Sequence, residues 1–289
     1  MKQNHGIVCL IVFFSFLMNN KSFSQMDETK INLALVQMTV EGGEPINNIA
    51  RAKRMIKEAA QNNAQIVLLP EALDLGWTDP SALTNALPIP EGETYRALAQ
   101  AAKSNKVYVC AGLIEKDGDK VYNSAVIIST EGELLLKHRK INELKIGHKY
   151  YALGENLNVC DTEYGRIGLM ICADANTKGK NLSRSLAMMG AELILSPCSW
   201  AVPADHDNEK EPYGKTWYNA YSPVAKEFSV WIAGCSNVGL MTGGPWKGWK
   251  GIGCSLVVDA EGNEQLKGPY GDDAETILYI EIAPVKHQR

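Results

Sequence analysis

Hydrophobic residues follow two patterns along this chain, one typical of strands and one typical of helices, and segments of the two kinds alternate. Short apolar runs typical of buried strands alternate with segments that carry an apolar residue every three or four positions, as amphipathic helices do. Strands are predicted over residues 31–38, 66–71, 107–116, 122–130, 134–141, 165–171, 191–200, 230–239 and 275–283. Helices are predicted over residues 47–61, 93–105 and 215–228, with a further one after residue 180. This alternation indicates a layered α/β architecture.

Turn signals complete the pattern. The sequences DGDK (117–120) and EGE (131–133) predict two hairpins, so the sheet is not purely parallel. The polar segment 201–214 is predicted to be a loop, and Pro223 should break or restart the helix around it. The glycines of TGGPWKGWKGIG (242–253) predict a flexible loop. No GxGxxG follows the first strand, which argues against a dinucleotide-binding fold.

Cys172 lies at an informative place in this pattern. It follows the apolar run GRIGLMI (165–171) directly, and the chain then turns into ADANTKGK. The next helix should bury Leu182, Leu186 and Met189 on one face. A strand, a tight turn and a helix present a nucleophile at the end of an α/β sheet. A buried cysteine is also a common small hydrophobe, so partners elsewhere must decide between the two readings.

The first 24 residues have the features of a secretory signal peptide. Lys2 precedes a twelve-residue apolar stretch (7–18), and small residues at Ser22 and Ser24 suit cleavage after Ser24. The apolar stretch is shorter than the ~18 residues that a membrane span needs. We therefore expect an exported protein with no membrane association after cleavage, comprising a single domain over residues 25–289.

Composition limits the classes of partner that the domain is expected to bind. Without residues 1–24, 27 basic and 33 acidic residues remain, a net charge of −6. A mildly acidic chain without a basic cluster is a poor binder of nucleic acid or anionic membranes. Six cysteines remain in the mature chain, with neither CxxC nor metal-finger spacing, and we expect buried free thiols. This expectation is weakest for Cys160.

Three residues of catalytic type are predicted to lie at strand ends: Glu71 after LLP, Lys140 in HRK and Cys172 after GRIGLMI. Singly, each has an ordinary explanation as a loop carboxylate, a surface cation or a core thiol. Together, LLPE, HRK and GRIGLMICAD resemble the nitrilase superfamily of carbon–nitrogen hydrolases. Further family-like stretches occur at residues 122–125, 185–197, 225–239 and 253–262, so the resemblance extends over nearly the whole mature chain.

The resemblance implies a four-layer α-β-β-α sandwich that forms a homodimer, and a cysteine hydrolase that needs neither cofactor nor metal. Cys172 would attack the carbonyl of a small linear amide to form a thioester, which water then cleaves. Glu71 would act as the base, because a thiol is mostly protonated at neutral pH. Lys140 and the backbone N–H of Ala173 would stabilise the oxyanion.

One position departs from the family pattern. Family members often carry a second glutamate seven residues before a loop glycine, and with Gly154 as that glycine the position falls on Gly147. After a shift in register Glu143 or His148 could replace it, or nothing does. A missing glutamate would favour an alternative in which the chain is a non-catalytic ligand-binding member.

The residues around the cysteine bear on the substrate. Asp174, two residues after Cys172, is typical of amidases, whereas true nitrilases tend to continue CWE. We expect Asp174, with Trp200, to be a substrate-binding residue. A nitrilase acting on a C≡N group is the main alternative. Transfer of the acyl group to an amine is possible from the same thioester. Aromatic residues near the expected rim, among them Trp200, would suit an apolar or planar substrate, although aromatic side chains are as often core. These residues are Trp77, Trp200, Tyr213 and Trp217.

Overall fold

The computed structural model describes residues 30–286, so the predicted signal peptide lies outside the described residues. Two six-stranded sheets form its centre. In spatial order the first contains β15 (Thr276–Ile282), β1 (Ile31–Gln37), β2 (Ile66–Leu68), β3 (Tyr108–Asp117), β4 (Lys120–Ile128) and β5 (Leu134–Arg139). The second contains β14 (Glu264–Lys267), β13 (Leu256–Val258), β10 (Trp231–Ser236), β8 (Leu193–Cys198), β7 (Gly165–Leu169) and β6 (Val159–Thr162).

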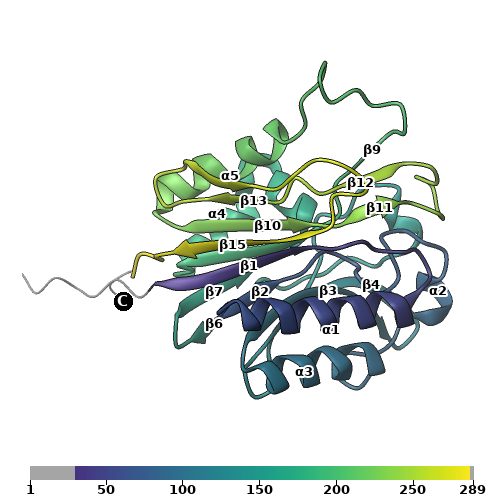
Figure 1. Ribbon diagram of the computed structural model, residues 1–289, viewed down its shortest axis with the longest axis horizontal. Coiled ribbons are helices and arrows are strands. Elements are labelled where there is room, and N and C mark those ends of the chain that lie inside the picture. Colours follow the sequence, from purple (N-terminus) through teal and green to yellow (C-terminus); the bar gives the residue numbers. More distant parts are fainter. Residues whose placement is uncertain (1–29, 287–289) are drawn as a thin grey trace, which may run out of the picture.

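Helices cover the outer faces of both sheets. Helices α1 (Pro45–Gln61) and α3 (Glu93–Asn105) lie on the first sheet, and α4 (Asn181–Met188) and α5 (Lys215–Phe228) lie on the second (Figure 1). The inner faces pack on each other, with β1 against β10 and β3 against β8. The predicted four-layer α-β-β-α sandwich is therefore confirmed. Smaller elements are α2 (Ala82–Asn85), the 3₁₀ turns η1 (Gly147–Lys149), η2 (Cys172–Asn176) and η3 (Lys178–Lys180), and a small sheet of β11 (Val238–Leu240), β12 (Lys250–Ile252) and β9 (Ala201–Val202).

Alternation along each strand divides the core into two parts. In β1, Leu33 and Leu35 belong to the core between the sheets, whereas Ala34 and Val36 pack beneath α1 and α3. Successive strand side chains point to opposite faces, so a strand that is apolar throughout must be covered on both. This is why the strands read as continuous apolar runs.

Strand direction brings the predicted catalytic residues to one edge. Strands β1, β2 and β3 are parallel, and β4 is antiparallel to both β3 and β5, so β5 runs in the same direction as β2. Strands β7, β8 and β10 are parallel in the second sheet. Glu71 and Lys140 therefore follow strands that end at the same edge of the first sheet.

Three local predictions need correction. Pro223 lies inside α5 without ending it, at an exposed position of the helix. The predicted loop 201–214 begins with β9, which pairs with β12. Helix α4 buries Ser183, Leu186 and Ala187, whereas Met189 ends up 38% exposed because the helix already ends at Met188.

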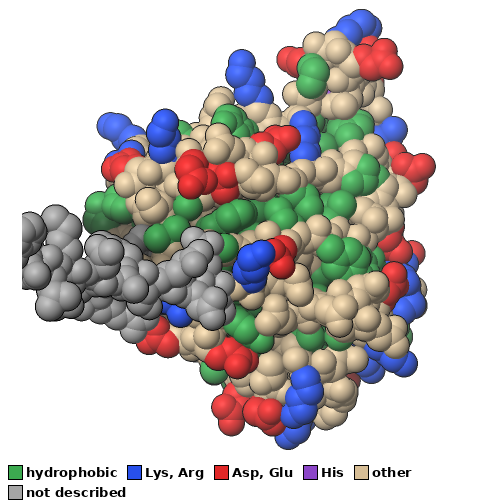
Figure 2. Space-filling model, turned by 60° about the vertical axis from the view of Figure 1, so that its left-hand side comes forward, with side chains coloured by type: hydrophobic (Ala, Val, Ile, Leu, Met, Phe, Trp, Pro, Cys, Tyr) green, Lys and Arg blue, Asp and Glu red, His purple; other side chains and the backbone are tan. Residues whose placement is uncertain are grey.

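The surface carries charges of both signs. On the face shown in Figure 2, acidic and basic side chains are interspersed around a band of hydrophobic side chains. This face therefore has no continuous basic surface of the kind that follows a nucleic-acid backbone. No helix among residues 30–286 combines the length and the apolar character that crossing a bilayer requires.

Candidate active site

Glu71, Lys140 and Cys172 line one cavity of about 330 Å³, together with Ala173. Glu71 follows β2, Lys140 follows β5, and Cys172 opens η2 just after β7. All three are buried, with exposures of 1%, 2% and 8%. The first two come from one sheet and the cysteine comes from the other, so the cavity lies where the two sheets meet.

The backbone around Cys172 forms a sharp turn. Its φ is +44°, a left-handed conformation that is uncommon for residues other than glycine. The N–H of Asp174 donates to the carbonyl of Ile171, and the N–H of Cys172 donates to Ser196 Oγ at 3.1 Å. These bonds hold the strained turn and keep the thiol in the cavity wall.

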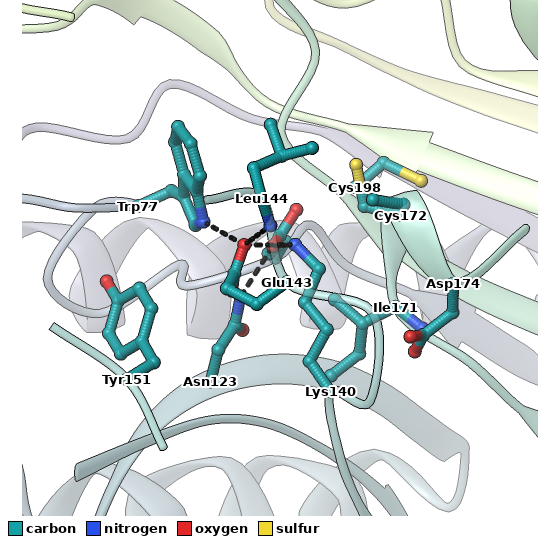
Figure 3. A network of polar contacts seen from close by, with 12 residues as sticks. Trp77, Asn123, Lys140, Glu143, Leu144, Tyr151, Ile171, Cys172, Asp174 and Cys198 are labelled. Atoms are coloured by element: carbon teal, nitrogen blue, oxygen red, sulfur yellow. Dashed lines mark hydrogen bonds and ion pairs between the residues drawn. The ribbon is translucent and has the colours of Figure 1, made fainter. Parts of the chain in front are cut away.

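Lys140 lies between two carboxylates. Its Nζ is 2.8 Å from Glu71 Oε1. It is also 3.1 Å from Glu143 Oε1, a contact that can be followed in Figure 3. Asn123 on β4 donates from Nδ2 to both acids, at 2.7 Å to Glu71 and 3.0 Å to Glu143. Trp77 Nε1 also donates to Glu143, at 3.3 Å. A buried charge persists only when it is paired and hydrogen-bonded, and this network meets both conditions.

The second glutamate that seemed to be missing is Glu143. Its side chain is 1% exposed and reaches Lys140 from three residues further along the chain. Turn η1 folds Gly147 back onto it: a Cβ on Gly147 would lie 2.7 Å from Glu143 Cγ and 2.8 Å from its Cδ. The glycine therefore leaves the space that the Glu143 carboxylate occupies. Gly147, which favoured a non-catalytic chain, therefore makes room for a member of the charged network.

Gly147→Ala is expected to lower kcat by about 10²-fold, because the added methyl group must displace Glu143 and a displacement of about 1 Å costs that much. Steady-state kinetics would measure the effect. A Gly147→Ala enzyme with wild-type kcat would contradict this account.

Burial and charge set the protonation states of the three predicted residues. Burial raises the pKa of Glu71 above its ordinary value, although Lys140 opposes the shift. Burial also holds the pKa of the Cys172 thiol well above its usual range, and Lys140 offsets only part of this. Burial lowers the pKa of Lys140, but the charges of Glu71 and Glu143 outweigh it and raise that pKa well above its ordinary value. The resting site therefore holds a neutral thiol and an ammonium group, next to a carboxylate more basic than usual.

Such an arrangement is suited to covalent catalysis at a carbonyl group. The thiol needs a base, and a carboxylate of raised pKa is a better base at neutral pH than an ordinary one. A family model described as carbon-nitrogen hydrolase matches residues 32–288. The chain belongs to this family.

Individual relatives agree with the assignment. The chain is similar to a nitrilase of Pyrococcus abyssi, with 37% identity over 177 residues that cover 60% of this chain and 66% of that protein. It is similar to the chloroplastic omega-amidase of Arabidopsis thaliana, with 28% identity over 267 residues, or 88% of this chain and 66% of that protein. The chain thus spans just under two thirds of these curated relatives. Its fold resembles Nit3 of Saccharomyces cerevisiae, a member of branch 10 of the nitrilase superfamily, with a TM-score of 0.75, 25% identity and coverage of 88% and 90%.

In this member of the carbon-nitrogen hydrolase family, Asp174 does not have the place expected of a substrate-binding residue. It is not among the residues that line the cavity, and its carboxylate is fully buried. It accepts hydrogen bonds from the backbone N–H groups of Ile171, Ile141 and Asn142, and its Oδ2 lies 2.8 Å from His138 Nε2. Asp174 therefore ties the chain after β5 to the chain after β7 and positions Lys140 relative to Cys172.

Asp174→Asn is expected to lower stability by about 2–3 kcal/mol, because an amide nitrogen would face one of the donors. Burial raises the pKa of Asp174, but His138 and the backbone donors outweigh this, and the net pKa lies below the ordinary value. A carboxyl whose pKa is depressed on folding contributes fully above its unfolded pKa of ~3.9, and the contribution is lost as the pH falls through the lower folded value. The difference in Tm between wild type and variant should therefore be largest near pH 6 and should become smaller below about pH 4. Thermal melts at several pH values would measure it, and a gap that does not change with pH would contradict it.

Trp200 also lies behind the cavity wall rather than in it. It is 1% exposed and stacks on Trp217 at 4.7 Å, and Trp217 itself lines the cavity with Tyr213. The sequence reasoning missed Trp246, which lines the cavity from the segment predicted to be a flexible loop. Asn142 and Asn176 were also missed, and their proximity to Lys140 and Cys172 in the sequence was the available signal.

The cysteines of the described residues fit the prediction of buried free thiols. All six in the described residues are free, and five are buried, with Cys160 partly exposed. Across residues 30–286, no group of three or more His, Cys, Asp or Glu side chains is placed to hold a metal ion.

Proposed function

We propose that this protein hydrolyses the carbon–nitrogen bond of a small linear amide through a thioester on Cys172, releasing ammonia or an amine. The observation that carries the proposal is the meeting of a thiol, an ammonium group and a carboxylate of raised pKa in one cavity. The names of its relatives, nitrilase and omega-amidase, support chemistry at a carbon–nitrogen bond.

In the first half-reaction, Glu71 takes the thiol proton as Cys172 Sγ bonds to the carbonyl carbon. The carbonyl electrons move to oxygen, and Lys140 and the N–H of Ala173 stabilise the anion. When the carbonyl re-forms, the carbon–nitrogen bond breaks, and Glu71 gives its proton to the departing nitrogen.

In the second half-reaction, Glu71 takes a proton from water, and the hydroxide formed attacks the thioester. Collapse of this intermediate breaks the carbon–sulfur bond and releases the carboxylic acid. The proton held by Glu71 returns to the thiolate, so the site is restored. Glu143 and Asn123 keep Lys140 and Glu71 in place throughout.

A panel of amides and nitriles tests the proposal. Purified protein is incubated with each compound, and ammonia release, acid formation and the intact mass of the protein are measured. We expect acid from amides and a transient acyl adduct on the protein. A strict nitrilase would leave the amides untouched. No product, no adduct and ordinary reactivity of Cys172 toward iodoacetamide would rule out the catalytic function.

We also infer that the protein is exported after cleavage at Ser24 and assembles as a homodimer. The leader composition supports the first inference, and the family resemblance supports the second. The mass of the mature protein from its native host should lack residues 1–24, and light scattering should give twice the mass of one chain. A retained leader or a monomer would contradict the respective inference.

A further inference from the structure

Aromatic side chains form much of the cavity wall. They come as two pairs: Trp77 with Trp246, and Tyr213 with Trp217. The rings of Trp77 and Trp246 are 4.6 Å apart, tilted by 56°. Trp217 Nε1 donates to Tyr213 Oη at 2.8 Å. A cavity at the lower end of the ~300–1,000 Å³ range of ligand sites thus has four aromatic residues in its lining.

Further rings support both pairs from outside the cavity. Trp249 stacks on Trp246 at 4.4 Å and 7°, and Trp200 stacks on Trp217 at 4.7 Å and 16°. The indole N–H groups of Trp77 and Trp217 are bonded to Glu143 and Tyr213. These two residues therefore offer ring surface, rather than hydrogen-bond donors, to a ligand. Supported rings are already in place before binding, which lowers the entropy cost of contact.

The charged side chains at the cavity disfavour an anionic ligand. Among the described residues that line it, the charged side chains are Glu71 and Lys140. The Lys140 ammonium contacts two carboxylates, Glu71 and Glu143, so the cluster carries one excess negative charge when all three are ionised. A carboxylate on a substrate would meet, in this lining, a cation that already contacts two carboxylates, and it would be repelled.

We propose that the cavity selects neutral amides whose acyl group ends in a flat, apolar portion such as an aromatic ring, and rejects amides that carry a carboxylate. This inference rests on the proposed function for the reaction, but its binding part concerns the cavity alone. Two observations carry it. The cavity has two supported aromatic pairs, and Lys140, the cation in the described lining, is already paired with carboxylates.

Two matched substrate comparisons test it. We expect kcat/KM for 3-phenylpropionamide to exceed that for propionamide by about 10-fold or more, the scale of discrimination in apolar pockets. We expect succinamate to be about 10-fold poorer than its neutral isostere 4-oxopentanamide. Equal values in the first comparison, or a preference for succinamate in the second, would overturn the inference.

Variants assign the selectivity to the aromatic pairs. Trp217→Leu and Trp246→Leu should each lower the ratio of kcat/KM for 3-phenylpropionamide to that for propionamide by several-fold. Trp246→Phe, which keeps a ring, should retain most of this ratio. Trp231→Leu is the matched control, because Trp231 begins β10, donates to the carbonyl of Ala283 and is not among the lining residues. An equal loss of the ratio in Trp231→Leu would overturn the assignment to the cavity walls.

A binding measurement separates this inference from the proposed function. Quenching of tryptophan fluorescence in Cys172→Ala gives Kd without turnover, and we expect at least about 10-fold tighter binding of 3-phenylpropionamide than of succinamate. If no amide is hydrolysed but this order holds, the proposed function fails and the inference stands. If amides are hydrolysed and succinamate binds as tightly, the inference fails and the proposed function stands.

Discussion

Replacing Cys172 with alanine is expected to reduce amide hydrolysis by at least 10⁴-fold, to the limit of detection. Loss of a covalent nucleophile removes the whole acyl-enzyme route, and comparable nucleophile deletions in hydrolases cost about 10⁶-fold in kcat. The strained turn favours a clean result, because alanine at φ +44° keeps the backbone conformation and removes only the sulfur. Ammonia release and intact mass after exposure to an amide measure the two consequences, lost turnover and a lost adduct.

Cys160→Ala is the matched control for this experiment. Cys160 is a free thiol on β6, partly exposed and not among the residues that line the cavity. Burial raises its pKa to about 11, and unlike Cys172 it does not share a cavity with Glu71 and Lys140 to activate it, so it is a poor nucleophile at neutral pH. This variant should keep both turnover and the adduct. An adduct that persists in Cys172→Ala, or disappears in Cys160→Ala, would place the nucleophile elsewhere.

Lys140→Met should have two effects at once. Loss of an oxyanion donor typically lowers kcat by 10²–10³-fold. The same change leaves Glu71 and Glu143 buried near each other without their cation, and breaking a buried ion pair from one side costs about 3–5 kcal/mol. Initial rates measure the first effect, and urea unfolding of the same preparation measures the second.

Two further variants separate catalysis from stability. Glu143→Gln added to Lys140→Met removes one unpaired charge, so it should restore part of the stability without restoring turnover. Lys137→Met removes a β5 lysine that pairs with buried Glu115 outside the cavity, and should cost stability with little change in kcat. A Lys140→Met enzyme with near-normal kcat would exclude Lys140 from the chemistry.

Local sequence pattern predicts the layered α/β architecture, whereas the four-layer sandwich and the candidate trio of Glu71, Lys140 and Cys172 are implied by the family resemblance. Continuous apolar runs identify doubly covered strands, and Glu71, Lys140 and Cys172 lie within three residues of the ends of β2, β5 and β7. Glu143 could not be assigned in the same way. Its place depends on the turn η1, which brings Gly147 against it, and residue spacing alone does not reveal that contact.

Two other outcomes have similar causes. Asp174 is close to Cys172 in sequence, but the turn at the cysteine directs its carboxylate toward backbone donors from another strand end. Trp246 lies in a glycine-rich segment without helix or strand period, so nothing local indicated that its ring reaches the cavity. Contacts between distant segments decided both cases.

The three proposed catalytic residues are divided between the two sheets, so the reaction depends on how closely the sheets pack against each other. The proposed acid–base group and the cation beside it follow strands of the first sheet, the thiol follows a strand of the second, and the N–H of Glu71 donates across to the carbonyl of Cys198 at 3.1 Å. A small slip between the layers would leave every strand and helix intact while separating the proton donor from its acceptor. Turnover should therefore decline on heating before circular dichroism reports any loss of secondary structure.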